Sequence, residues 1–319
     1  MVELAEAVLG ASPAMGAVRH MLPKIAACDA AVLITGSTGT GKEHLARTVH
    51  ALSPRAKGPF VAVNCSAVPD TLFESEFFGF ERGSFTGALA AQKGKAALAD
   101  GGTLFLDEVA EMSMHAQAKL LRLLEEHEVS PIGAEKPRKV DIRVVAATNR
   151  QVEEAVAAGQ LRSDLYYRLN VARIALPDLA ERPEDIETFF DHFIDRFNRR
   201  KGGQVRRPEP ELMDALKRYR WPGNVREIRN FVEAVFIDPP RGAISFADIP
   251  PAFATLRDQF ARTEGDERER IIAALEHTNW NKAEAAKSLS WSRMTLYRKL
   301  ERYRVVRPFG GGGSEEGEE

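Results

Sequence analysis

The sequence predicts an α/β domain with a mostly parallel sheet, followed by helices and a small all-α domain near the carboxyl end. Short apolar runs rich in β-branched residues lie at residues 30–35, 59–64, 102–107 and 141–148, and helical patterns separate them. Such alternation is typical of parallel strands joined by crossover helices. Residues 171–176 are a candidate fifth strand.

The composition bounds the class of protein. The chain has 319 residues, of which 44% are hydrophobic and 28% charged, so we expect two or three folded domains. No apolar run approaches the roughly 18–20 uncharged residues of a membrane span, and the first residues lack the basic flank of a secretion signal. We therefore expect a cytoplasmic protein without a membrane partner. Cys28 and Cys65 have no metal-ligand spacing, which predicts two buried, reduced thiols.

A glycine-rich turn follows the first predicted strand and leads directly into a helical pattern. Its residues match the G-x-x-x-x-G-K phosphate loop and are Gly36, Ser37, Thr38, Gly39, Thr40, Gly41 and Lys42. In such a loop the backbone N–H groups face phosphate oxygens, and Lys42 reaches the β- and γ-phosphates of ATP. Glu43 ends the candidate loop where a Mg²⁺-binding hydroxyl is expected, so the metal must rely on other groups. The alternative is a turn that only joins a strand to a helix.

Two carboxylates follow the strand at residues 103–106. Asp107 can hold Mg²⁺ while Glu108 polarises the attacking water, because the end of a parallel strand places both beside the phosphate loop. Such a pair alone is weak support, since acidic residues often cap helices. The phosphate loop upstream turns it into a strong prediction of ATP hydrolysis.

The stretch Gly83-Ser84-Phe85-Thr86-Gly87-Ala88 is similar to the GAFTGA loop of the sigma-54-dependent transcriptional activators, a family of AAA+ ATPases. In that family the loop rises from the surface of a hexamer and touches the sigma factor. The resemblance implies that Phe85 and Thr86 make this contact, with Ser84 in place of alanine. Without it, the segment would be interpreted as a glycine-hinged loop whose Phe85 packs locally.

The same resemblance assigns roles around the two carboxylates. Asn64 resembles the switch residue that turns Glu108 toward or away from the water. Thr148 and Asn149 resemble the first sensor of the family. These roles come from the resemblance alone.

Three arginines also match motifs of the family. Arg162 and Arg168 resemble the arginine fingers that a neighbouring subunit inserts, and Arg226 resembles the second sensor in the lid. A guanidinium from a neighbour stabilises charge on the γ-phosphoryl group, so hydrolysis would depend on ring assembly. Each arginine alone could instead be an ordinary surface residue.

The carboxyl end of the chain is basic although the formal net charge is −2. Residues 292–307 contain six basic residues and one acidic residue, and two short helical patterns joined by a turn precede residue 303. This pattern is similar to the Fis-type helix-turn-helix of the same family, whose second helix enters the major groove. Ser290 and Trp291 occupy the turn. The candidate DNA-binding residues are Arg293, Thr295, Arg298, Lys299 and Arg302. A basic helix that only solvates a surface is the alternative.

The expected fold is therefore an α/β AAA+ P-loop NTPase with a helical lid and an all-α helix-turn-helix domain. We expect the nucleotide-binding domain at residues 1–176, the lid at 177–250, a linker at 251–265, the helix-turn-helix domain at 266–308 and a disordered acidic tail at 309–319.

The leading functional hypothesis is an activator that binds enhancer DNA and uses ATP and Mg²⁺, as a hexamer, to remodel the closed sigma-54 RNA polymerase promoter complex. One alternative is a regulator that binds nucleotide without hydrolysing it; the intact Lys42, Asp107 and Glu108 argue against it. Another is a different AAA+ remodeller, against which only residues 83–88 argue. Little chain precedes the phosphate loop, so either a regulatory protein acts in trans or a regulatory domain is missing from this sequence.

Overall fold

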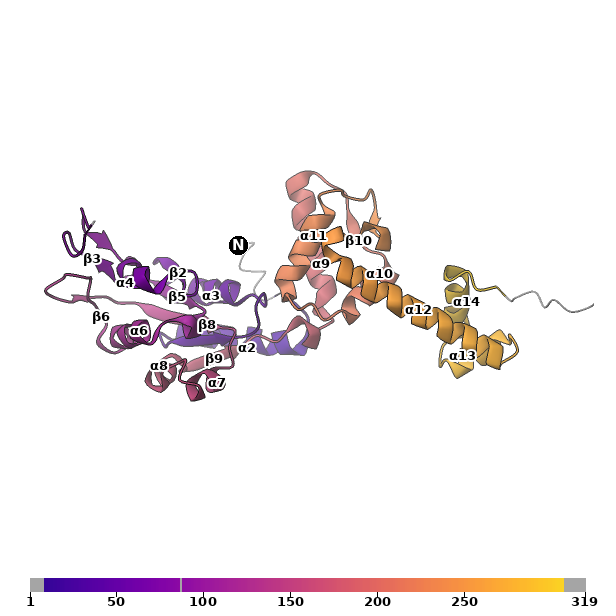
Figure 1. Ribbon diagram of the computed structural model, residues 1–319, viewed down its shortest axis with the longest axis horizontal. Coiled ribbons are helices and arrows are strands. Elements are labelled where there is room, and N and C mark those ends of the chain that lie inside the picture. Colours follow the sequence, from indigo (N-terminus) through magenta and orange to yellow (C-terminus); the bar gives the residue numbers. More distant parts are fainter. Residues whose placement is uncertain (1–8, 87, 307–319) are drawn as a thin grey trace, which may run out of the picture. The chain divides into compact units, whose positions relative to one another are not determined.

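The computed structural model describes residues 9–86 and 88–306, so Gly87 and the expected acidic tail lie outside the described residues. The chain divides into two compact units, Met1–Asp248 and Ile249–Glu319 (Figure 1). The first unit contains both the expected α/β domain and the expected lid.

A five-stranded, fully parallel sheet forms the centre of the first unit. Its strand order is β2-β5-β8-β1-β9, and each expected strand is present. The strands are β1 (Val32–Thr35), β2 (Phe60–Asn64), β5 (Thr103–Asp107), β8 (Arg143–Thr148) and β9 (Ala172–Ala175). Because β8 lies between β1 and β5, the carboxyl ends of these three strands are adjacent.

Helices cover both faces of the sheet, as parallel strands require. Alternate residues of β8 show the division: Val145 packs with one helical layer and Val144 with the other. The first layer consists of α2 (Pro13–Ala27) and α3 (Lys42–Ala51). The second contains α4 (Asp70–Phe78), α6 (Met114–Glu126), α7 (Val152–Ala157) and α8 (Ser163–Leu169), and the short helices α5 (Lys95–Leu98) and η1 (Val109–Glu111) adjoin it.

Two short hairpins lie side by side in this domain (Figure 1). β3 (Gly79–Phe80) pairs with β4 (Gln92–Lys93), and β6 (Glu128–Val129) pairs with β7 (Arg138–Lys139). A bridge between Phe80 and Ile132 joins the two hairpins. The GAFTGA-like segment is therefore the loop of the first hairpin.

The lid follows β9 and has an aromatic core. Trp221 is fully buried against Phe190 and Phe231, and its Nε1 donates to the carbonyl of Leu216 over 2.8 Å. The helices are η2 (Leu179–Glu181), α9 (Asp185–Lys201), α10 (Pro210–Arg218), α11 (Asn224–Val235) and η3 (Phe246–Asp248). The lid also contains β10 (Arg206–Pro208), paired in parallel with β11 (Ala243–Ile244), which the sequence analysis missed because both strands are very short.

The second unit is a small helical domain. It consists of η4 (Pro251–Phe253), α12 (Ala254–His277), α13 (Lys282–Ser288) and α14 (Arg293–Arg302), packed around Ile271, Leu275, Leu296 and Leu300. The expected linker at 251–265 is helical rather than irregular. The stretch contains three alanines and two arginines, which favour a helix, and no proline follows Pro251 to stop it.

The prediction of two buried thiols is wrong for one of them. Cys65 is buried, and its burial raises the pKa of the thiol to about 12, whereas Cys28 is exposed at the end of α2. Cys28 follows the last turn of a helix, where periodicity no longer determines burial. Within the described residues, no helix is both long and apolar enough to cross a membrane.

Candidate active site and nucleic-acid interface

The phosphate loop joins β1 to α3 and takes backbone conformations that only glycine adopts easily. Gly36, Gly39 and Gly41 all have positive φ angles, at 154°, 82° and 106°. A Cβ atom at Gly39 would lie 2.2 Å from the carbonyl oxygen of Gly223 in the lid. The loop is therefore pressed against the lid at a position where no side chain fits.

Lys42 is the first residue of α3, and its ammonium group folds back over the loop. It is 7% exposed and donates to the carbonyl of Gly36 over 2.9 Å. Glu43 lines the nucleotide cavity, and its carboxylate pairs with Arg47 one turn later at 2.7 Å. Thr40 donates its hydroxyl to the carbonyl of Ser37 over 2.8 Å.

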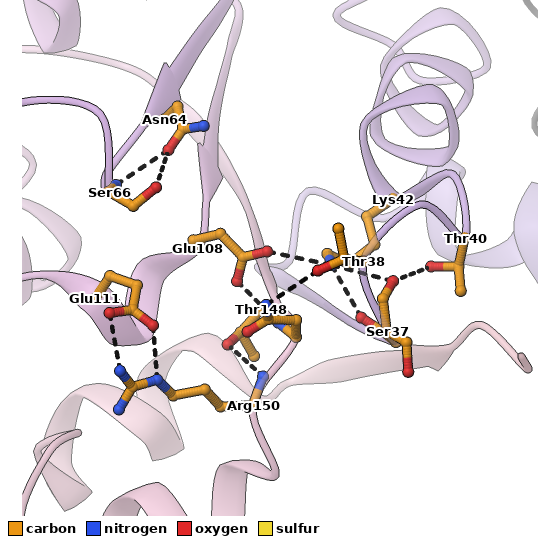
Figure 2. A network of polar contacts seen from close by, with 12 residues as sticks. Ser37, Thr38, Thr40, Lys42, Asn64, Ser66, Glu108, Glu111, Thr148 and Arg150 are labelled. Atoms are coloured by element: carbon orange, nitrogen blue, oxygen red, sulfur yellow. Dashed lines mark hydrogen bonds and ion pairs between the residues drawn. The ribbon is translucent and has the colours of Figure 1, made fainter. Parts of the chain in front are cut away.

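Glu108 stands at the end of β5 between the lysine and the end of β8 (Figure 2). Its Oε1 lies 3.3 Å from Nζ of Lys42, and its Oε2 accepts a hydrogen bond of 2.9 Å from the backbone N–H of Asn149. The backbone of Glu108 is left-handed, with φ 55° and ψ 49°. A non-glycine residue in this region costs about 1–3 kcal/mol and persists only where its surroundings impose it.

Asp107 provides an oxygen suited to a cation. Its Oδ1 is buried and has no hydrogen-bond partner among the described residues. Burial, together with the neighbouring charge of Glu108, raises the pKa of the Asp107 carboxyl. A hard divalent cation such as Mg²⁺ prefers oxygen ligands of this kind and is bound through one or two carboxylates plus substrate phosphates. In the described part of the chain no group of three or more His, Cys, Asp or Glu side chains forms a complete metal site.

The candidate switch and sensor residues lie around the carboxylates but differ in what they face. Asn64 turns toward Ser66, from which its Oδ1 accepts two hydrogen bonds, and not toward Glu108 (Figure 2). Thr148 is buried, and its hydroxyl accepts from the N–H of Arg150 over 3.1 Å. Asn149 faces the phosphate loop and donates to Oγ1 of Thr38 over 3.2 Å. Of the two sensor candidates, Asn149 is therefore the one that lines the site.

A cavity of about 500 Å³ joins these groups to the lid. One end contains Lys42, Asp107, Glu108 and Asn149, and the phosphate loop forms its floor. The lid supplies Arg182, Phe189, Phe193, Val225, Arg226 and Arg229. An elongated ligand with phosphates at one end and an aromatic ring at the other suits this lining.

The two candidate arginine fingers do not line this cavity. Arg162 precedes α8 and pairs with Asp164 at 2.7 Å. Arg168, on the same helix, donates to the carbonyl of Leu124 over 2.9 Å. The structure therefore brings the two arginines together on α8 but apart from the phosphate loop of their own subunit.

The loop of the first hairpin exposes both Phe85 and Thr86, whereas Ser84 bonds within the loop. Phe85 makes an edge contact with Phe80 at a centroid distance of 5.0 Å and is still 44% exposed. Thr86 is exposed beside it. Ser84 donates its hydroxyl to the carbonyl of Glu81 over 2.8 Å, so it closes the base of the loop rather than pointing outward.

α14, the second helix of the helix-turn-helix, is preceded by Ser292, whose hydroxyl caps it by accepting from the N–H of Thr295 over 3.1 Å. Arg293, Arg298 and Arg302 are exposed on this helix. Tyr297 is also exposed, which the sequence analysis did not single out. These side chains form the candidate DNA-binding face.

Lys299, another candidate DNA-binding residue, is less exposed than these side chains and makes contacts within the domain. Its Nζ pairs with Glu267 of α12 at 2.6 Å and lies 5.2 Å above the ring of Trp291, and the side chain is 19% exposed. Position 299 follows Leu296 by three residues and precedes Tyr303 by four, so it shares the packed side of the helix.

Three family models match the chain in order. They are a sigma-54 interaction domain at residues 8–175, an AAA+ ATPase lid domain at residues 180–266 and a Fis-family bacterial regulatory domain at residues 266–303. The chain belongs to the sigma-54 interaction domain family. It is an AAA+ P-loop ATPase of the sigma-54-dependent transcriptional activators, with a helix-turn-helix domain for DNA.

Relatives and solved structures agree with this membership. The transcriptional regulatory protein ZraR of Salmonella typhimurium is 44% identical over 92% of this chain and 68% of its own length. The Nif-specific regulatory protein of Enterobacter agglomerans is 43% identical over 92% of this chain, which spans only 59% of that relative. Crystal structures of NtrX from Brucella abortus with ADP and with ATP are 34% and 35% identical, cover 93% of this chain and 69% of NtrX, and have TM-scores of 0.71 and 0.70.

In this sigma-54 activator, the sequence analysis overlooked one residue at the contact between lid and phosphate loop. Asn224 donates from Nδ2 to the carbonyl of Thr38 over 3.1 Å and accepts at Oδ1 from the N–H of Leu179 over 2.7 Å. Next to it, the backbone N–H of Arg226 donates to the carbonyl of Gly39 over 3.3 Å. The available signal was the stretch Trp221-Pro222-Gly223-Asn224, whose proline and glycine interrupt a helical pattern.

Proposed function

We propose that this activator hydrolyses ATP in a ring of subunits and uses the energy to remodel a closed sigma-54 RNA polymerase promoter complex. Membership of the sigma-54 interaction domain family supports the partner. The crystal structures of NtrX with ADP and with ATP support the ligand, since NtrX matches this chain through both the sheet and the lid.

The chain's own groups divide the chemistry between them. Lys42 binds the β- and γ-phosphates, and this exchanges its contacts with Gly36 and Glu108 for stronger ones with phosphate oxygens. Glu108, once released, accepts a proton from the attacking water. Asp107 would hold Mg²⁺, which would supply positive charge beside the phosphates. Asn64 lies one strand away, and its side chain, which contacts Ser66 here, would reach Glu108 only after it turns.

Arg162 and Arg168 act on the nucleotide of a neighbouring subunit. Their positions on α8, outside the lining of their own cavity, support this assignment. Hydrolysis then requires an assembled ring, in which a guanidinium from one subunit stabilises the charge developing on the γ-phosphoryl group of the next. We propose a hexamer, as is usual in this family.

The helix-turn-helix domain anchors the ring to enhancer DNA. The exposed arginines of α14 reach base edges or phosphates, while Thr295 lies at the start of the same helix. Lys299 stabilises the domain through Glu267 instead of binding DNA.

The observation that carries the sigma-54 assignment is the exposed pair Phe85 and Thr86 on the first hairpin. An apolar ring beside a hydroxyl group suits the grip of a protein partner, and neither residue lines the nucleotide cavity. Thr86 can therefore be changed without touching the chemistry of ATP.

Thr86→Ala tests this assignment in promoter-opening assays with sigma-54 polymerase, with and without ATP. The variant is expected to keep its ATPase rate and ring assembly while promoter opening and nucleotide-dependent sigma-54 binding are lost. Thr86→Ser is the matched control, because it keeps the hydroxyl group. A Thr86→Ala variant that opens promoters like the parent, or a parent that never binds sigma-54, would favour a different AAA+ remodeller.

A further inference from the structure

Arg182 is a buried arginine whose hydrogen-bonding groups are only partly used. It follows η2 in the lid and is 1% exposed. Its Nε and Nη2 atoms have no hydrogen-bond partner within residues 9–86 and 88–306. Its ion pair with Asp185 is long, with 3.8 Å between Nη1 and Oδ2. A buried cation with unused donors is costly unless something completes its contacts.

Asp185 cannot supply the missing contacts, because another segment uses its carboxylate. Oδ1 accepts from the backbone N–H of Ser12 over 2.8 Å, and Oδ2 accepts from the hydroxyl of Ser12 over 2.7 Å. The chain also passes very close at Gly10, where a Cβ atom would lie 2.4 Å from Oδ2. The carboxylate is thus committed to the segment that precedes α2.

Arg182 lines the nucleotide cavity on its lid side, together with Phe189 and Phe193. Its nearest aromatic neighbour is Phe189, whose ring centre lies 5.7 Å from the guanidinium carbon. Phe189 in turn stacks on Phe193, at a centroid distance of 6.4 Å. This end of the cavity therefore combines two flat apolar rings with unused hydrogen-bond donors.

We propose that Arg182 binds the nucleoside part of the nucleotide, donating hydrogen bonds to acceptor atoms of the base or the ribose. The inference rests on the proposed nucleotide binding and adds to it a residue that sets affinity and selectivity away from the phosphates. Guanidinium nitrogens only donate, while purine ring nitrogens and ribose oxygens accept. Nε and Nη2 of Arg182 are the donors that the nucleoside would occupy.

The test compares the full-length parent with Arg182→Met in competition binding against a fluorescent ATP analogue. ATP and inorganic tripolyphosphate serve as paired competitors, because only ATP has a nucleoside. We expect Arg182→Met to lower the affinity for ATP at least tenfold and to leave the affinity for tripolyphosphate unchanged within twofold. The added competitors 2′-deoxy-ATP, GTP and CTP then distinguish a ribose contact from a base contact. If Arg182 contacts the ribose, the variant loses the parent's discrimination against 2′-deoxy-ATP only. If it contacts the base, the variant loses the discrimination against GTP and CTP only.

Two further variants keep the result interpretable. Arg143→Met removes an equally buried arginine, whose guanidinium donates to the carbonyls of Ile25 and Ala26 far from the cavity, and it should lower stability without changing ATP affinity relative to tripolyphosphate. Arg182→Lys retains a cation if the methionine variant fails to fold, and it should still weaken ATP several-fold.

The possible failures are distinct. If the parent binds ATP and the Arg182 variants bind it equally well, this inference is overturned, but the proposed nucleotide binding is not. Equal losses for ATP and tripolyphosphate would also overturn it, because the effect would then come from the fold or from the phosphate end. A parent that binds neither competitor would overturn the proposed nucleotide binding itself.

Discussion

Oε1 of Glu108 lies 3.3 Å from Nζ of Lys42, so the carboxylate that follows β5 and the cation of the phosphate loop, which follows β1, neutralise each other across β8. The contact is possible because β8 alone separates β1 from β5. Phosphate binding and release of the carboxylate are therefore linked, since phosphates that attract Lys42 free Glu108.

Lys42→Ala and Glu108→Gln should separate binding from hydrolysis. Without Lys42 the phosphates lose their main cationic partner, and affinity should fall by about 100-fold or more, at about 1.4 kcal/mol for each tenfold. Glu108→Gln should retain ATP and slow hydrolysis by about 10²–10⁴-fold, the usual contribution of a general base. Titration with a fluorescent ATP analogue and phosphate-release kinetics measure the two effects. Near-normal turnover in Glu108→Gln would remove that residue from the water-activating role.

Subunit mixing tests the two arginines of α8. Arg162→Ala and Arg168→Ala should each be inactive alone, because every site lacks the charge donated by its neighbour. Mixing either with Lys42→Ala should restore part of the ATPase rate, since some sites then combine an intact loop with intact arginines. The rate of phosphate release, measured over a range of mixing ratios, shows how activity depends on the proportion of the two variants. If no ratio restores activity, the arginines act within one subunit or have no catalytic part.

Arg298→Ala and Lys299→Met should give opposite results on the same helix. Loss of the exposed Arg298 should weaken specific DNA binding by about 1–3 kcal/mol if it reads a base, with the ATPase rate unchanged. Lys299→Met should lower the melting temperature of the helix-turn-helix domain, because Glu267 loses its partner, and should change DNA affinity little. Footprinting and thermal unfolding are the measurements. Equal DNA defects in both variants would return Lys299 to the DNA interface.

Asp107→Asn should stabilise the nucleotide-free protein at neutral pH. The pKa of Asp107 is raised by burial and by Glu108, so the folded state holds this proton more tightly than the unfolded state does. Its contribution to stability therefore declines as pH rises from about 4 through the raised pKa, and the full penalty is present once the pH exceeds that pKa. Asparagine removes that penalty. The melting temperature of Asp107→Asn should therefore vary less between pH 4 and 7.5 than that of the parent.

Asp164→Asn is the control of opposite sign for this pH profile. The pKa of Asp164 is lowered, chiefly by its hydrogen bond from Arg162, so this exposed carboxylate stabilises the fold when ionised. Its replacement should not raise the melting temperature at pH 7. A rise of equal size in both variants would show that the Asp107 effect is a general consequence of removing negative charge.

Ser290→Gly should stabilise the helix-turn-helix. Ser290 takes a left-handed conformation between α13 and α14, with φ 57°, and its side chain is exposed. A non-glycine residue there costs roughly 1–2 kcal/mol, of which the greater entropy of unfolded glycine cancels about half. We expect a net gain of about 0.5–1 kcal/mol in the free energy of unfolding, measured with denaturant. Ser288→Gly, inside α13, should be destabilising by comparison.

The sequence by itself determined the features that depend on local pattern. The five parallel strands followed from apolar runs, the phosphate loop from glycines between a strand and a helix, and the helix-turn-helix from a basic amphipathic repeat. Asp107 and Glu108 were found in the same way, because a strand end next to a phosphate loop leaves few other places for them. These signals are read over a few residues, so no distant contact can alter them.

Only the tertiary structure decided which side chains meet. The strand order placed Asn149 rather than Thr148 at the cavity, because the alternation along β8 turns Thr148 into the buried layer. Packing of the small domain placed Lys299 beside Glu267 of α12, although a helical repeat of the sequence alone allowed either position. Arg182 gave no sequence signal at all. Ser12, 173 residues before Asp185 in the chain, donates to the carboxylate that also forms the long ion pair with Arg182.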